Sequence, residues 1–152
     1  MPGLGLLSSA APTAGYAVKA AATMVNGQTV FTVAGGPILI QALVSLCVTN
    51  NGATASTLQY SVTPTVGAGA QTISAASGSL ANATAGASVT LAGTALSTAA
   101  LYNANGPNLI ANPGTIFCPA GTITMVIGTG STTGTWEHHI YYYALGDSVT
   151  VS

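Results

Sequence analysis

The sequence predicts an all-β protein, a single β-sandwich of the jelly-roll type. Two observations support this prediction: about seven to nine short strand-like runs lie between Gly, Pro and Asn residues, and a helical spacing of apolar residues is nearly absent. The chain of 152 residues has the size of one domain. An immunoglobulin-like sandwich is the second choice, because the order Cys, Trp, Cys expected there is not met: Trp136 follows both cysteines.

Two strand-like runs follow each other in the first third of the chain. Gln28 to Val33 alternates and ends at Gly35-Gly36, and Pro37 to Thr49 follows with apolar residues on both faces. Such a strand is covered on both sides, and in a protein this small the second cover can be another subunit. Thr57 to Thr63 alternates cleanly after a turn at Asn50 to Gly52, which predicts that these two strands form a hairpin.

Further short strands are predicted in the second half of the chain. They cover Gln71 to Ser74, Ser88 to Leu91, Thr122 to Ile127, Thr135 to Leu145 and Val149 to Val151. Gly128 to Gly134 is polar and glycine-rich, and we expect it to be the flexible tip of a hairpin. The segment Ala95 to Tyr102 is compatible with a short helical turn, and the Asn-rich segment Asn103 to Pro113 predicts a long loop.

Residues 1–27 are predicted to form an extended N-terminal arm, and residues 28–152 the β-sandwich domain. The beginning of the chain is rich in Gly, Pro, Ser and Ala, and such an arm is either frayed or laid on a neighbouring subunit. A secretory signal is not expected, because the only lysine, Lys19, follows the leucines instead of preceding them. No membrane partner is expected either, since the most apolar stretch, Pro37 to Val48, is too short to cross a bilayer.

Charged side chains are nearly missing from this sequence. Only Lys19, Glu137 and Asp147 carry a formal charge, which is 2% of the residues where about 25% is usual. A nucleic-acid partner is excluded, because one lysine cannot form a basic surface. Acid–base catalysis has few side chains to draw on, so we expect a protein that is not an enzyme and needs no cofactor. A structural or binding role remains.

The two cysteines, Cys47 and Cys118, both stand within apolar stretches. Buried free thiols behave as small apolar side chains, and this is the preferred interpretation. A disulfide between them is the alternative. Two cysteines this far apart do not have the spacing of zinc ligands.

The densest cluster of functional side chains runs from Trp136 to Tyr143. In a strand, Glu137 and His139 share a face with two of the tyrosines, while His138 points the other way. These two residues could supply two metal ligands, but further ligands are missing unless symmetry provides them. The preferred interpretation is a core strand with a polar aromatic face against a neighbour, and sugar binding to the tyrosines is a third reading. The candidate interface residues are Leu39, Leu43, Trp136, Glu137, His139, Tyr141 and Tyr143.

Two runs, Phe31 to Ile40 and Leu58 to Pro64, together with the long Ala/Gly/Thr-rich middle, resemble small virion proteins of tailed bacteriophages. Among these, the chain is most similar to capsid decoration (cement) proteins built as β-sandwiches. The resemblance implies a non-enzymatic protein on the outer surface of the virion capsid. It also implies a homotrimer that binds the major capsid protein and clamps neighbouring capsomers, with the N-terminal arm contacting the shell.

Two other functions stay open. A head-fibre, tail or receptor-binding module would hold host glycans through Trp136 and the tyrosines. A cell-surface adhesin or surface-layer module would require a secretion signal and favour a Cys47–Cys118 disulfide. An enzyme that uses Glu137 and His139 with a metal is the least favoured reading.

Overall fold

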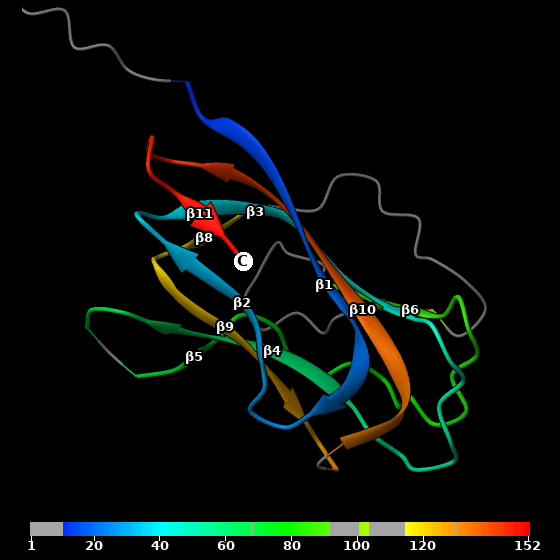
Figure 1. Cartoon of the computed structure of the whole chain (residues 1–152). Helices are drawn as coiled ribbons and strands as arrows, with labels where there is room; N and C mark the ends of the chain where they lie inside the picture. The colour runs from blue at the N-terminus through cyan, green and yellow to red at the C-terminus, as the bar shows by residue number, and fades with distance from the viewer. Residues whose placement is uncertain (1–10, 68, 92–100, 104–114, 130) are drawn as a thin grey trace, which may run out of the picture.

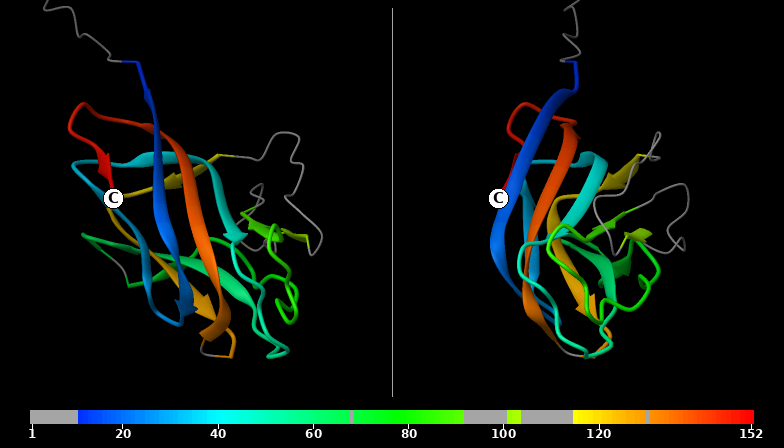
Figure 2. Two further views of the ribbon diagram at one scale, coloured as in Figure 1. Left: turned by 45° about the vertical axis from the view of Figure 1, so that its right-hand side comes forward. Right: turned by 90° about the vertical axis from the view of Figure 1, so that its right-hand side faces the viewer.

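The protein consists of two antiparallel β-sheets that face each other (Figure 1). The computed structural model describes residues 11–67, 69–91, 101–103, 115–129 and 131–152, and within these ranges it contains eleven strands and no helix. Figure 2 shows the long strands β1, β10 and β3 side by side in one layer. The prediction of an all-β sandwich is therefore confirmed.

One sheet, sheet A, has six strands. Its spatial order is β1 (Thr13–Val25), β10 (Ser131–Ala144), β3 (Ile38–Cys47), β6 (Ser88–Thr90) and β7 (Leu101–Asn103). The sixth strand, β8 (Ile116–Cys118), pairs with the edge of β3 that β10 leaves free. Two of the long strands of this layer, β1 and β3, therefore come from the first third of the chain, and the third, β10, comes from near its end.

The other sheet, sheet B, has five strands. Its order is β11 (Thr150–Val151), β2 (Thr29–Ala34), β9 (Gly121–Ile127), β4 (Leu58–Pro64) and β5 (Gln71–Thr72). Across the two sheets the pairings are nested in sequence: β1 pairs with β10, β2 with β9, β3 with β8 and β4 with β5. The first four strands, β1 to β4, thus alternate between the sheets.

This alternation overturns two predicted hairpins. The runs around β3 and β4 are not paired with each other, because β3 lies in sheet A and β4 in sheet B. The glycine-rich segment after β9 is likewise a crossing between the sheets and not a hairpin tip, since β9 pairs with β2 and β4 while β10 pairs with β1 and β3. Local turn signals indicated where the chain reverses, but the partner of each strand was set by distant segments.

The N-terminal part of the chain also differs from the prediction. Thr13–Val25 is not part of an arm outside the sandwich but the edge strand β1, paired with β10 from Thr13–Ala144 to Val25–Ser131. Gly15 lies beneath the ring of Tyr142, where a Cβ atom would collide with it. The sandwich therefore begins before residue 28, and residues 1–10 lie outside the described part of the chain.

The other short predicted strands have mixed outcomes. Three of them are confirmed: Gln71 to Ser74 contains β5, Ser88 to Leu91 contains β6, and Val149 to Val151 overlaps β11. The predicted helical turn is wrong at its end, because Leu101 and Tyr102 belong to β7. The rest of that turn, and the predicted loop after Asn103, lie outside the described residues.

The core lies between the sheets, and a bulge in β3 determines which of its residues reach it. Tyr141 pairs with Ala42 and Tyr142 with Ile40, so Gln41 is an additional residue in β3. The side-chain alternation therefore changes phase: Ile38 and Ile40 point inward before the bulge, and Leu43, Ser45 and Cys47 point inward after it. An uninterrupted alternation over Pro37 to Thr49 is therefore wrong, because the inserted residue Gln41 breaks the period of two.

Both cysteines are buried and free, which confirms the preferred interpretation of Cys47 and Cys118. Burial raises the pKa of the Cys118 thiol to about 11, and burial likewise raises the pKa of Cys47. Both thiols are thus protonated at neutral pH and behave as small apolar side chains.

Candidate functional site

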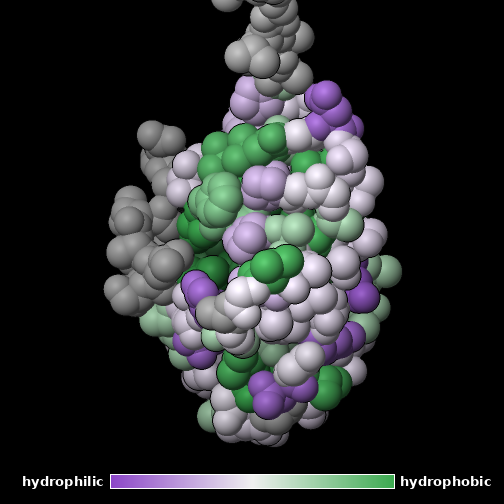
Figure 3. All heavy atoms as spheres, turned by 90° about the vertical axis from the view of Figure 1, so that its left-hand side faces the viewer, coloured by the Kyte–Doolittle hydropathy of each residue, from purple (hydrophilic) through white to green (hydrophobic). Residues whose placement is uncertain are grey.

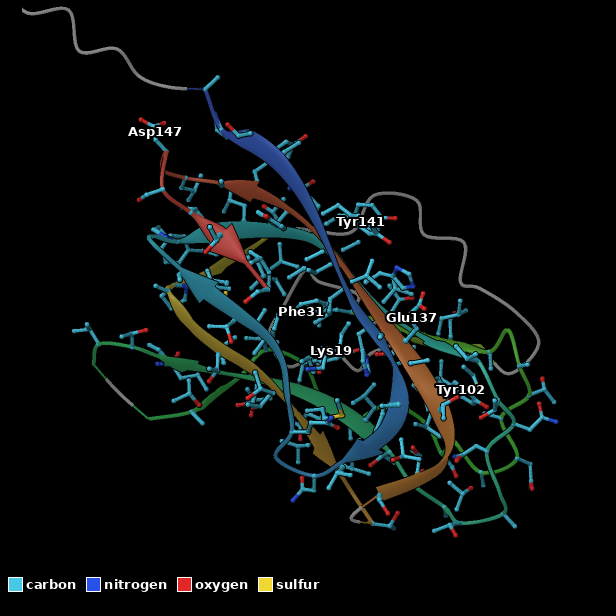
Figure 4. The ribbon with its side chains drawn as sticks, in the orientation of Figure 1. Lys19, Phe31, Tyr102, Glu137, Tyr141 and Asp147 are labelled. Carbon is cyan, nitrogen blue, oxygen red and sulfur yellow. The ribbon has the colours of Figure 1, made fainter. Side chains whose placement is uncertain are left out.

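The outer side of sheet A carries a continuous set of aromatic and aliphatic side chains, which we call the tyrosine face. Cross-strand register places Tyr16 beside Tyr141, Leu39 between Tyr143 and Phe117, and Val44 beside His139. The tyrosine face consists of Tyr16, Val18, Leu39, Val44, Leu46, Phe117, Glu137, His139, Tyr141 and Tyr143. Figure 4 shows Tyr141 and Glu137 on the outer side of β10, whereas Lys19 of β1 lies on the opposite side of sheet A and Phe31 of sheet B lies in the core between the sheets.

Several of these side chains are exposed to a degree that is unusual for large apolar residues. Phe117 is 60% exposed, Tyr16 50% and Tyr141 48%, and Val18 and Tyr143 are also exposed. A contiguous exposed apolar patch on a soluble protein commonly marks an interaction site. Tyrosine suits such a site, because it buries a large area and still offers a hydrogen bond.

The polar groups of the tyrosine face are paired with one another. The Tyr16 hydroxyl lies 2.7 Å from His139 Nδ1, and His139 Nε2 lies 2.7 Å from Glu137 Oε1. Desolvation, together with the neighbouring Tyr141 and Glu137, raises the pKa of Tyr16, so its hydroxyl stays protonated and can donate to Nδ1. The His139 tautomer with its hydrogen on Nε2 then donates to the Glu137 carboxylate, while Nδ1 accepts from the Tyr16 hydroxyl, so both hydrogen bonds are made.

Two aromatic contacts hold this network in place. The rings of Tyr16 and Tyr141 lie 4.6 Å apart, and the rings of Tyr16 and His139 are stacked at 6.0 Å. Glu137 is the only side chain of the tyrosine face with a formal charge, and its Oε1 already accepts a hydrogen bond from His139 within the face. The rest of the face is uncharged, which suits an uncharged partner surface more than a charged one.

The predicted interface residues divide between the outside and the core. Glu137, His139, Tyr141 and Tyr143 share the outer face of β10 as predicted, and Leu39 lies half-buried on the same side. Two candidates are wrong: Leu43 and Trp136 are fully buried in the core. Leu43 points inward because the bulge at Gln41 changes the phase of the side chains that follow it. Trp136 points inward because it precedes Glu137, and successive side chains of a regular strand face opposite sides.

Sequence reasoning missed five members of the tyrosine face, namely Tyr16, Val18, Val44, Leu46 and Phe117. The first two were assigned to an arm, although their alternation with Ala17 and Lys19 is a strand signal. Phe117 stands in a strand of three residues, which is too short to show any period. Only the pairing with Leu39 places it on this face.

A second polar network lies in the core behind the tyrosine face, and the sequence did not indicate it. Ser45 Oγ lies 2.6 Å from His138 Nδ1 and 2.6 Å from the Tyr60 hydroxyl. The chain of contacts joins β10 and β3 of sheet A to β4 of sheet B. Burial is the largest cause, followed by the electrostatic influence of His139 and Lys19, and together they lower the pKa of His138 to about 4, so its imidazole is neutral at pH 7.

Other kinds of site are not formed by the described residues. Within the described ranges, no three His, Cys, Asp or Glu side chains come together as metal ligands. No helix in the described part of the chain is long and apolar enough to cross a membrane. Comparison with known protein families, curated proteins and solved structures finds no match.

Proposed function

We propose that this protein is a structural component of a bacteriophage virion, a decoration or cement protein that binds the outer surface of the capsid. The observation that carries the proposal is the tyrosine face, a broad and nearly uncharged surface with exposed aromatic side chains such as Tyr141 and Phe117. The partner is the major capsid protein, and the protein acts without catalysis. A homotrimer is the assembly we favour, because symmetry repeats weak contacts and so gains avidity.

The connectivity of the strands is compatible with this proposal. Nested pairing of the first strands with the last, as in β1 with β10 and β2 with β9, is what rolling up one long double hairpin produces. We infer a jelly roll, an architecture that occurs in viral capsid domains and also in lectins. The fold supports the virion role by analogy only, and the argument for binding depends on the tyrosine face.

The mass of the protein in solution tests the assembly. Three chains of 14.8 kDa should elute as a particle of about 44 kDa in gel filtration with light scattering.

The double substitution Tyr141→Ser and Tyr143→Ser should raise the dissociation constant of the trimer roughly tenfold or more, since aromatic anchors dominate interfaces. Val126→Ser is the control, because Val126 is exposed on the outer side of sheet B. A wild-type monomer of 14.8 kDa would contradict the preformed trimer.

Association should be nearly insensitive to salt. Salt weakens contacts between exposed charges, and the tyrosine face has only the Glu137–His139 pair, which is internal to it. We expect the dissociation constant of the trimer to change by less than about threefold between about 0.1 M and 1 M NaCl. A steep loss of association with added salt, followed by light scattering, would show that ion pairs hold the assembly.

Glycan binding is the second candidate function, and the exposure of Tyr141 and Tyr143 favours it. Aromatic rings offer apolar faces, and the Glu137 carboxylate beside them could accept hydrogen bonds from sugar hydroxyls. A glycan array separates the two functions. Binding that Tyr141→Ala abolishes would favour a receptor-binding module, whereas an array without hits, together with a trimer in solution, would favour the structural role.

A further inference from the structure

A groove crosses one end of sheet B, where β2 and β4 end and β9 begins; we call it the strand-end groove. Its volume is about 600 Å³, within the range of ligand-sized clefts. Figure 3 views the molecule from this side. The lining residues are small or apolar, and none of those described carries a charge: Thr32, Val33, Ala34, Gly35, Gly36, Thr63, Pro64, Thr65, Val66, Ala120, Gly121 and Thr122.

Two glycines of the strand-end groove allow neighbouring backbone segments to pack closely in its walls. Gly35 has a φ of 77°, and a Cβ atom there would collide with the backbone carbonyl of Ser148. Gly121 packs so closely on Thr63 that it has no room for a side chain either. At the rim, Val66 is 87% exposed, more than any other large apolar residue in the described part of the chain. An apolar occupant would remove this side chain from water.

The beginning of the described chain lies near one end of this groove. Ala11 and Thr13 line a cleft together with Asp147, in the turn that follows β10. In the same turn, the Ser148 hydroxyl donates a hydrogen bond of 3.1 Å to the carbonyl oxygen of Gly35, which lines the strand-end groove. Ten residues before Ala11 can span up to about 33 Å when extended, so residues 1–10 can reach the groove.

The sequence of these ten residues fits the groove. They contain Leu4, Leu6 and Leu7, no charged side chain, and Gly and Pro residues that allow the chain to lie flat and to turn. An uncharged groove lined by Ala, Pro, Val and Thr selects an apolar, uncharged segment. This complementarity and the position of Ala11 indicate the occupant.

We propose that the strand-end groove is the docking site for residues 1–10 of the chain, with the three leucines as anchors. The segment is that of the same copy, because Ala11 of the same chain lies near the groove. This proposal is independent of the virion role, because it concerns sheet B and the N-terminal segment and not the tyrosine face.

Disulfide trapping in the full-length protein tests the docking. In the double variant Leu6→Cys with Thr63→Cys, oxidised glutathione should form the cross-link at least roughly tenfold faster than in the control variant Leu6→Cys with Thr54→Cys, if the segment is docked. Thr54 is exposed in the connection between β3 and β4, at the opposite end of the sandwich. The native thiols are buried and have raised pKa values, so they react slowly.

The products and one further variant decide the outcome. A cross-linked monomer on a non-reducing gel supports the proposal, whereas cross-linked dimers or larger species in its place would overturn it in favour of exchange between copies. Adding Leu4→Ser and Leu7→Ser to the trapping variant should bring its rate to that of the control. Equal rates in the two original variants, or fast trapping that persists without the leucines, would overturn the proposal.

Discussion

Acidification from pH 7 to pH 4 is expected to destabilise the folded protein by about 3 kcal/mol through one side chain, His138. Its pKa is about 4 in the folded protein and 6.5 in the unfolded chain. Between these values the unfolded chain binds a proton that the folded protein does not bind. Stability is therefore intact above about pH 6.5 and is lost as the pH falls toward 4.

The effect should be easy to isolate, because the background is small. Acid denaturation normally reflects many carboxylates, but this chain has only Glu137 and Asp147. The groups beside His138 are Ser45 on β3, Tyr60 on β4, Lys19 on β1 and its chain neighbour His139. A protonated imidazole can only donate from Nδ1, so Ser45 Oγ must then accept that hydrogen bond.

Urea unfolding at pH 7 and pH 4, followed by the fluorescence of Trp136, measures the difference. The variant His138→Gln does not titrate and should lose most of the pH dependence, although its stability at pH 7 is lower because the Ser45 contact changes. His139→Gln is the comparison variant: it lies on the outer face and should keep most of the pH dependence, because burial is the largest cause of the lowered pKa of His138 and His139 is a smaller one. An equal pH dependence in wild type and His138→Gln would contradict the assignment.

Replacement of Trp136 by alanine is expected to lower the free energy of unfolding by about 3–5 kcal/mol. The side chain is fully buried between Ala22 of β1 and Cys47 of β3, at the end of the core opposite the strand-end groove. Alanine would leave a cavity that the paired strands cannot close. In a domain of this length the melting temperature should fall by roughly 10 °C or more.

The variant Trp136→Phe separates volume from hydrogen bonding. The indole Nε1 of Trp136 is buried and has no hydrogen-bond partner, so phenylalanine removes no polar contact. We expect a loss below about 1.5 kcal/mol, from the smaller ring alone. Far-UV circular dichroism in urea is the measurement, since both variants lack the only tryptophan. A loss below about 1 kcal/mol for Trp136→Ala would show that this end of the core is loosely packed.

Part of the candidate site could be predicted from the sequence. The period of two in β10 placed Glu137, His139 and Tyr141 together on one face, because alternation is a local property of an extended backbone. The same alternation gives Trp136 the opposite phase, toward the core, although Trp136 is among the candidate interface residues. What the period could not decide was which face would remain exposed, since that depends on what each neighbouring strand covers.

The remaining members of the tyrosine face depended on long-range pairing. Tyr16 joins His139 only because β1 pairs with β10, more than a hundred residues away in the chain. The inward position of Leu43 depends on the bulge at Gln41, which forms only when β3 is held between β10 and its other neighbours. The His138–Ser45–Tyr60 contacts likewise require three strands from two sheets.

By itself, the sequence determined the all-β class, most strand positions, the near absence of charge and the buried state of the thiols. These properties follow from composition and from alternation along single strands, which need no partner. The tertiary structure alone decided the sheet to which each strand belongs, the inclusion of β1 and the assembly of the tyrosine face. Strand pairing joins segments that are distant in the chain, and one extra residue, such as Gln41, reverses the direction of every side chain that follows.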